Sequence, residues 1–165
     1  MGEVERHELA WWGEKIVNDP ELMPIDANGK RPGDAEYGTP PIVSFCNYGI
    51  HRICRGMKYD AFSGMLANQI CDHLDAKWIK TSGTNEQKAA AAQIAANIGD
   101  LAIAALRGSP HGHVAVIAPG NKVFSGKWDC YLPRCYNVGR KNGVMGINYA
   151  FDIFPEFYVL GRVTI

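Results

Sequence analysis

Cys46 is the residue of this chain best placed to act as a nucleophile. Residues 40–50 begin with two prolines, which hold the chain extended because each ring fixes φ and disfavours a helical residue before it. The apolar residues that follow, Ile50, Ile53 and Met57, have the spacing of one helical face. Cys46 therefore lies where an extended segment turns into a helix. A helix start lowers the pKa of a thiol, although a cysteine without a partner is usually only a small buried hydrophobic residue.

His113 is the candidate general base for this thiol. It opens the apolar run 113–118, in which alternate side chains point to opposite faces of a strand, and Gly112 before it leaves room beside the imidazole. Alone, such a histidine could equally be satisfied in the core or at a sheet edge. A cysteine at a helix start and a histidine on a later strand are together the two halves of an activated thiol.

A third group is expected to orient the imidazole by accepting a hydrogen bond from its other nitrogen. Three residues that follow His113 are candidates, and we rank them Asn137, Cys135, Asp129. Asn137 comes first because its amide oxygen is a good acceptor, whereas a thiol is a weak one. Cys135 and Asn137 share one face of the expected strand. The choice among the three stays open.

The helices that must hold these residues follow from the apolar periodicity. Residues 3–18 and about 60–76 have the pattern of amphipathic helices. Residues 84–98 begin with the capping box Thr-Asn-Glu-Gln and continue as an Ala-rich helix. The loop over 19–41 is rich in Gly, Pro, Asp and Asn and ends just before Cys46. Loops of this length are usually functional, so we expect this one to wall or cover a cleft.

From Gly99 onward the pattern becomes β. Apolar runs bounded by turns predict strands at 101–106, 113–118, around Phe124, and at 128–138, 144–151 and 157–165. Helices first and strands later predict an α+β fold, with N-terminal helices packed on a C-terminal antiparallel sheet. The chain has 165 residues and no repeat or linker, so a single domain over 1–165 is expected.

Composition argues against several classes of function. The 17 basic and 17 acidic side chains cancel, so no charged field favours nucleic acid. The apolar runs are too short to span a bilayer, and the charged stretch 1–6 does not read as a secretory signal peptide. The five cysteines are odd in number and irregularly spaced, unlike a disulfide framework. We therefore expect neither a nucleic-acid partner nor a membrane span.

Three short motifs occur in order: Phe45-Cys46-Asn47, then Gly99-Asp100-Leu101-Ala102-Ile103, then Gly112-His113-Val114-Ala115-Val116-Ile117. In this order and spacing they resemble the NlpC-type papain-like cysteine peptidases and the related CHAP amidases. That family places its nucleophile at a helix N-terminus, a Gly-Asp-Leu turn before the first core strand, and its base histidine on the next strand. The resemblance spans roughly 44–138. The family's usual Asp-Cys-Ser-Gly is Phe45-Cys46-Asn47-Tyr48 here, closer to the CHAP version, so no carboxylate precedes the nucleophile.

The resemblance implies a papain-like fold and hydrolysis of amide bonds in bacterial peptidoglycan stem peptides, commonly the bond between D-glutamate and the diamino acid. Cys46 is then the nucleophile, His113 the general base and Asn137 the orienting residue, with no metal or organic cofactor. An upstream aromatic residue often supports the oxyanion, and Tyr37 is the candidate. Such an enzyme acts in the periplasm or cell wall as a wall hydrolase, a lysin or a secreted antibacterial effector. An effector would have a cognate inhibitor or immunity protein as partner.

Two alternatives stay open. Cys130, Cys135, His111 and His113 are side chains of the type that zinc prefers, so they could belong to a metal-binding or regulatory module. NlpC relatives also include acyltransferases, which move acyl groups to amines or lipids.

Overall fold

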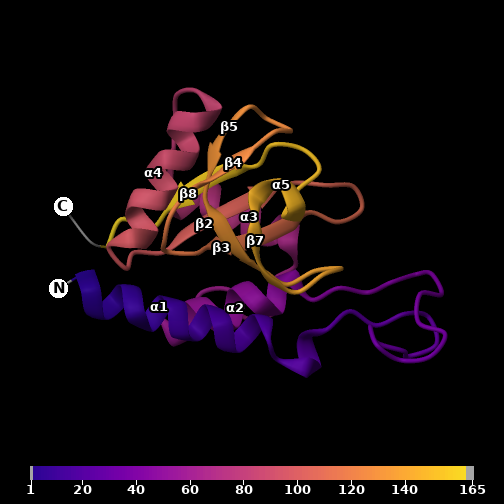
Figure 1. The fold of residues 1–165 in the computed structure, drawn as a ribbon. Coiled ribbons are helices and arrows are strands. Elements are labelled where there is room, and N and C mark those ends of the chain that lie inside the picture. The colour runs from indigo at the N-terminus through magenta and orange to yellow at the C-terminus, as the bar shows by residue number, and fades with distance from the viewer. Residues whose placement is uncertain (1, 163–165) are drawn as a thin grey trace.

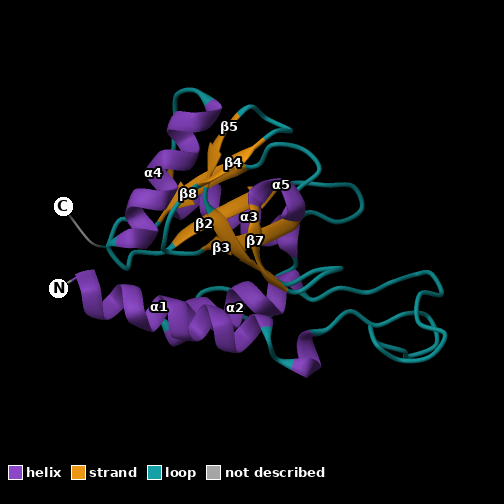
Figure 2. Cartoon of the chain, viewed as in Figure 1, coloured by secondary structure: helices purple, strands orange, loops and turns teal. Residues whose placement is uncertain are grey.

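A computed structural model describes residues 2–162, which form an α+β fold (Figures 1 and 2). The helices are α1 (Gly2–Val17), the short 3₁₀ helix η1 (Pro20–Leu22), α2 (Cys46–Gly56), α3 (Ala67–Lys77), α4 (Asn85–Asn97) and α5 (Ile147–Ala150). The strands are β1 (Ile79–Lys80), β2 (Ala102–Leu106), β3 (His113–Ile117), β4 (Val123–Ser125), β5 (Cys130–Leu132), β6 (Arg134–Asn137), β7 (Gly143–Gly146) and β8 (Glu156–Val159). Within this part of the chain, no helix is both long and apolar enough to cross a membrane.

The main sheet is antiparallel throughout, with strand order β1-β8-β2-β3-β6-β7, and β4 and β5 form a separate hairpin. Its centre is β2 and β3, and Ala102, Ile103 and Ala104 of β2 are fully buried. Successive buried residues mean that β2 is covered on both faces. In Figure 1, α1 and α2 lie side by side below the sheet and α4 lies above it.

Two glycines let the helices below the sheet approach it closely. A Cβ atom at Gly13 of α1 would lie 2.3 Å from the ring of Tyr136 on β6. A Cβ atom at Gly49 of α2 would lie 2.7 Å from Val138, just after the same strand. Both separations are shorter than carbon atoms tolerate, so any side chain at these two positions would push its helix away from the sheet.

The prediction for α4 is confirmed. The Thr84 hydroxyl accepts from the Gln87 backbone N–H at 3.2 Å, and Gln87 Oε1 accepts from the Thr84 N–H at 2.9 Å, which is the reciprocal capping box. The helix ends before Gly99, whose φ of 81° lies in the left-handed region that glycine adopts most easily. Apart from Gln93, the buried side chains of α4 are small alanines, so this helix also packs closely.

The helix predicted over 60–76 is wrong in its first part, because α3 begins only at Ala67. Gly64 has a φ of 74°, which no α-helix contains. Phe62 is buried from a turn rather than from a helix, and its ring packs 5.5 Å from Tyr59 and 6.1 Å from Trp78. The apolar spacing that predicted a helix here comes instead from an aromatic cluster of Tyr59, Phe62 and Trp78.

Two strand predictions also need correction. The stretch 128–138 is divided at Pro133, with β5 in the hairpin and β6 in the main sheet, because proline cannot donate to a ladder. The stretch 144–151 leaves the sheet after Gly146 and forms the short helix α5. The last predicted strand is β8, which ends at Val159, and residues 163–165 of that prediction lie outside the described residues.

Replacing Gly13 by alanine should lower the free energy of unfolding, because the new methyl group meets the Tyr136 ring. Overpacking of this kind costs about 1–3 kcal/mol, more than the helix propensity gained. Urea unfolding measures the change, and Gly126→Ala is the matched control because nothing lies within 4 Å of its added Cβ. Equal stability of the two variants would contradict the close approach of α1.

Candidate active site

The extended approach to Cys46 and the helix that follows it are both confirmed. Val43 and Ile25 form an isolated antiparallel bridge, with backbone hydrogen bonds of 2.8 and 2.9 Å. Cys46 is the first residue of α2, and Ile50 and Ile53, which have the predicted helical spacing, are buried. The thiol therefore lies where backbone N–H groups are free of helical partners.

Burial, rather than the helix start, dominates the acidity of the Cys46 thiol. The side chain is only 8% exposed, and desolvation raises its pKa above the ordinary value of 9.0. The backbone N–H groups of Val114, Asn47 and Cys46 itself pull the pKa down but do not reverse the rise. The expectation of a lowered thiol pKa is therefore wrong for this structure. The Val114 N–H places the sulfur beside the start of β3, one residue after His113.

His113 and Asn137 are brought together. Their Nε2 and Oδ1 atoms lie 2.6 Å apart. The contact follows from the antiparallel register of β3 and β6, which sets Ile117 opposite Cys135. Asn137, two residues after Cys135, therefore lies on the same face of the sheet as His113 and near it. The other two candidates are placed elsewhere, since Cys135 is fully buried and Asp129 lies in the turn before β5.

The hydrogen bonds of Asn137 also fix the tautomer of His113. Asn137 Nδ2 donates to the Lys141 carbonyl oxygen at 2.7 Å, and because a carbonyl can only accept, the amide oxygen must face the imidazole. His113 Nε2 therefore carries the proton of the neutral ring. Its Nδ1 is left with a free lone pair that can take a proton from a thiol.

The surroundings of His113 keep the imidazole neutral. Burial lowers its pKa below the ordinary 6.5, and the hydrogen bond that Nε2 donates to Asn137 offsets part of that shift. The Phe151 ring packs 4.8 Å away, and a Cβ atom at Gly139 would lie 3.2 Å from the imidazole Cε1. Thiol and imidazole are thus both uncharged at neutral pH. Neither Phe151 nor Gly139 carried a sequence signal for this role.

The loop over 19–41 is organised by one carboxylate. Asp26 Oδ1 accepts from the backbone N–H groups of Asn28 and Lys30, and Oδ2 accepts from those of Gly38 and Thr39. Burial pushes the pKa of Asp26 up, but these four donors outweigh it and hold the pKa below 3.8. Figure 1 shows the segment reaching out beyond the helices and the sheet. It does not fold over the sheet as expected of a cover.

The base of this loop is nevertheless joined to the turn after Asn137. Asn142 Oδ1 accepts from the Gly139 N–H at 2.9 Å, and Asn142 Nδ2 donates to the Leu22 carbonyl at 2.7 Å. Tyr37 belongs to the same loop, and its backbone N–H donates to the Asp34 carbonyl. Among residues 2–162, no side-chain hydrogen bond joins Tyr37 to Cys46 or His113. Its oxyanion role stays a prediction.

The four side chains of the alternative metal site are not brought together. Within residues 2–162, no three His, Cys, Asp or Glu side chains gather closely enough to hold a metal ion. Cys130 belongs to the hairpin and Cys135 to the main sheet, and all five cysteines are free. His111 is exposed in the turn before β3.

Three hollows of the surface, with volumes of about 360, 800 and 500 Å³, are each lined in part by α1, and Cys46 lines none of these three. What singles out the candidate site is its chemistry: the Cys46 sulfur meets the Val114 N–H of β3, and the histidine that opens the same strand is oriented by an amide.

Comparison with known proteins does not assign the chain to a family. No protein-family model matches the chain, and no curated protein matches it significantly.

Cys46 should be the first cysteine to react with a limiting dose of iodoacetamide, because it is 8% exposed and the other four are 5% exposed or less. The thiolate is the reactive form, so the rate should climb with pH through 9.0 and beyond, since burial raises the thiol pKa. Peptide mapping over a pH series measures both effects. A rate that is already maximal at mildly acidic pH would reveal a preformed thiolate and contradict the neutral pair.

Proposed function

We propose that the protein is a cysteine-dependent amidase or endopeptidase with a papain-like fold of the NlpC type, hydrolysing amide bonds in peptidoglycan stem peptides. The observation that carries the proposal is the 2.6 Å contact between His113 Nε2 and Asn137 Oδ1 at the start of β3. The backbone N–H of the next residue, Val114, points at the Cys46 sulfur. A helix-start thiol, a base and an orienting amide are the parts that covalent amide hydrolysis needs.

The neutral pair sets the order of proton transfers. His113 Nδ1 takes the thiol proton as the sulfur bonds to the scissile carbonyl carbon, so charge develops only during attack. The Cys46 backbone N–H, free at the helix start, donates to the oxyanion. His113 then gives the proton to the leaving amine, which departs and leaves a thioester. Finally His113 takes a proton from water as the hydroxyl adds, and the thiol is regenerated as the acid leaves.

The substrate class rests on the order of motifs that resembles the NlpC family. The Gly99-Asp100-Leu101 turn before β2 is fixed by the carboxylate of Asp100. Its Oδ1 accepts from the Leu101 N–H and its Oδ2 from the Gly161 N–H, both at 2.9 Å. β2 and β3 then follow as antiparallel neighbours, with Leu106 opposite His113. The loop over 19–41, anchored beside the site through Asn142, is the segment we assign to substrate selection.

Cys46→Ala should abolish the release of muropeptides from purified peptidoglycan, with a fall of at least about 10³-fold in rate, because no other group supplies the nucleophile. Mass spectrometry of the digest measures the loss and identifies the bond cut in the wild type. Cys130→Ala, which removes the buried thiol of the separate β4–β5 hairpin, is the matched control and should stay active. Full activity of Cys46→Ala would refute the mechanism, and transfer to an added amine in place of hydrolysis would indicate an acyltransferase.

The acid side of the pH–activity profile should follow His113, which must be neutral to accept a proton. Its pKa is lowered, so activity should persist below pH 6.5 and fall only as the pH drops through the folded value. The Asn137 hydrogen bond raises that pKa, so Asn137→Ala should move the acid limb to lower pH while reducing kcat about 10- to 100-fold through lost orientation. Steady-state kinetics across a pH series tests the shift. An acid limb that moves to higher pH would exclude His113 as the base.

A further inference from the structure

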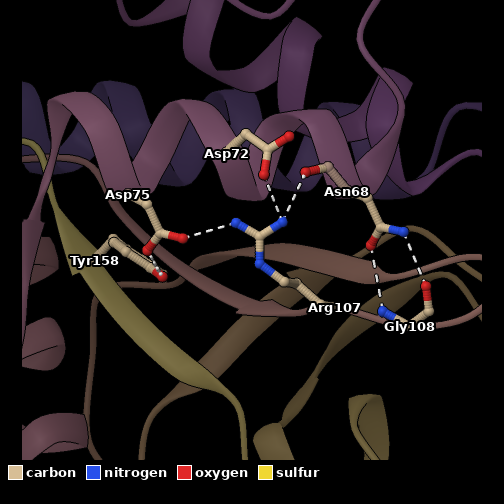
Figure 3. Close-up of polar contacts among 6 residues, drawn as sticks. All are labelled: Asn68, Asp72, Asp75, Arg107, Gly108 and Tyr158. Carbon is tan, nitrogen blue, oxygen red and sulfur yellow. Dashed lines mark hydrogen bonds and ion pairs between the residues drawn. The ribbon is translucent and has the colours of Figure 1, made fainter.

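The turn that leads into His113 is held by a side chain of α3. Asn68 Nδ2 donates to the Gly108 carbonyl at 2.8 Å, and Asn68 Oδ1 accepts from the Gly108 N–H at 3.2 Å (Figure 3). The Asn68 side-chain amide thus hydrogen-bonds both the N–H and the carbonyl of Gly108, as the backbone of a neighbouring strand would. The turn between β2 and β3 therefore has a fixed partner outside the sheet.

Asn68 also meets the far end of the same turn. A Cβ atom at Gly112, the residue before His113, would lie 2.5 Å from Asn68 Oδ1 and 2.6 Å from the Leu106 carbonyl oxygen. Only glycine leaves room for the amide at this point. Asn68 therefore contacts both Gly108 and Gly112, and it sets the path by which the chain enters β3 at His113.

The residue before Gly108 ties the turn to α3 a second time. Arg107 lies 2.6 Å from Asp72 Oδ1 and 2.7 Å from Asp75 Oδ2, and the Tyr158 hydroxyl of β8 donates to the other oxygen of Asp75 (Figure 3). The three ionic side chains are 42–70% exposed. Exposed pairs contribute about 0–1 kcal/mol each, so their effect is mainly to fix the geometry.

The residues just before Asn68 also bind the start of α2. Asn47, next to Cys46, donates from Nδ2 to the Met65 carbonyl oxygen at 3.1 Å. Met65 lies three residues before Asn68, at the entry to α3. Residues 65–68 are thus bound on one side to the nucleophile's helix and on the other to the turn of the base.

We propose that Asn68 is a positioning residue for the Cys46–His113 pair, through its clamp on Gly108 and Gly112. The inference rests on the proposed function for its kinetic consequence. It also makes a structural claim of its own, that the amide of Asn68 sets where the Val114 N–H meets the Cys46 sulfur.

The kinetic test uses Asn68→Ala in the full chain. We expect kcat for muropeptide release to fall about 10- to 100-fold with KM within about threefold, because a misplaced base slows chemistry more than binding. Asn68→Asp keeps the acceptor for the Gly108 N–H, but it loses the donor and sets a negative charge against the Gly108 carbonyl, so it should recover at most part of kcat. Asn18→Ala is the matched control and should match the wild type. It also removes a hydrogen bond from an asparagine side chain to a backbone carbonyl, that of Glu14 at 2.8 Å.

A second readout keeps the positioning claim separate from the proposed activity. Loss of the clamp should speed amide hydrogen exchange at residues 108–114. It should also move the pH midpoint of Cys46 labelling upward, because the Val114 N–H that lowers the thiol pKa is no longer held. These measurements remain decisive if the wild type cleaves no peptidoglycan. An unchanged kcat in folded Asn68→Ala, or an unchanged labelling midpoint, overturns the inference even if the melting temperature falls.

Discussion

The approach of α2 to the sheet at Gly49 is the constraint on which the candidate site depends. An added Cβ there would lie 2.7 Å from Val138, so the helix axis can come this close only because the position has no side chain. Cys46 precedes Gly49 by three residues and therefore lies on the same face of the helix. The face that touches the sheet thus carries the sulfur to the Val114 N–H. A larger residue at position 49 would separate the thiol from β3 without touching either Cys46 or His113.

This close approach also decides the charge state of the site. A helix N-terminus stabilises a nearby anion by about 0.3–1 kcal/mol at an exposed site and by up to about 2 kcal/mol at a partly buried one, which is at most about 1.5 pKa units. Burial of an ionisable group shifts its pKa by up to about 3–5 units, so desolvation prevails at Cys46. The same burial acts in the opposite direction on the His113 cation. Burial therefore favours the neutral forms of both the Cys46 thiol and the His113 imidazole, and in the proposed mechanism charge develops only during attack.

The sequence predicted what depends on local pattern and failed where distant contacts decide. Cys46 at a helix start and His113 at a strand start follow from prolines and apolar spacing, and the Asn137 preference follows from acceptor chemistry. Phe62 was misassigned to a helix because a buried aromatic in a turn gives the same spacing, although Gly64 nearby was a warning. The thiol pKa was misjudged because the burial of Cys46 depends on how α2 packs, and periodicity does not report packing distance.

Most of the polar contacts that sequence reasoning missed are made by one residue type, asparagine. Asparagines join separate backbones around the site, namely Asn47, Asn68 and Asn142 in addition to Asn137. A single asparagine adds no periodicity to its segment, whether helix or loop, and its partner can lie anywhere in the chain, so no local pattern indicates it. Each such hydrogen bond contributes only about 0.5–1.5 kcal/mol, and their main effect is on geometry.

An amide suits these positions better than a carboxylate because it both donates and accepts without charge. Asn137 accepts from His113 and donates to the Lys141 carbonyl, and a carboxylate could make only the first of these bonds. The Lys141 carbonyl would then face a buried anion, and that anion would favour the charged form of His113. The base would be protonated at a higher pH, and the neutral pair would be lost. The amide of Asn137 therefore orients the imidazole and leaves its Nδ1 lone pair free, as the proposed mechanism requires.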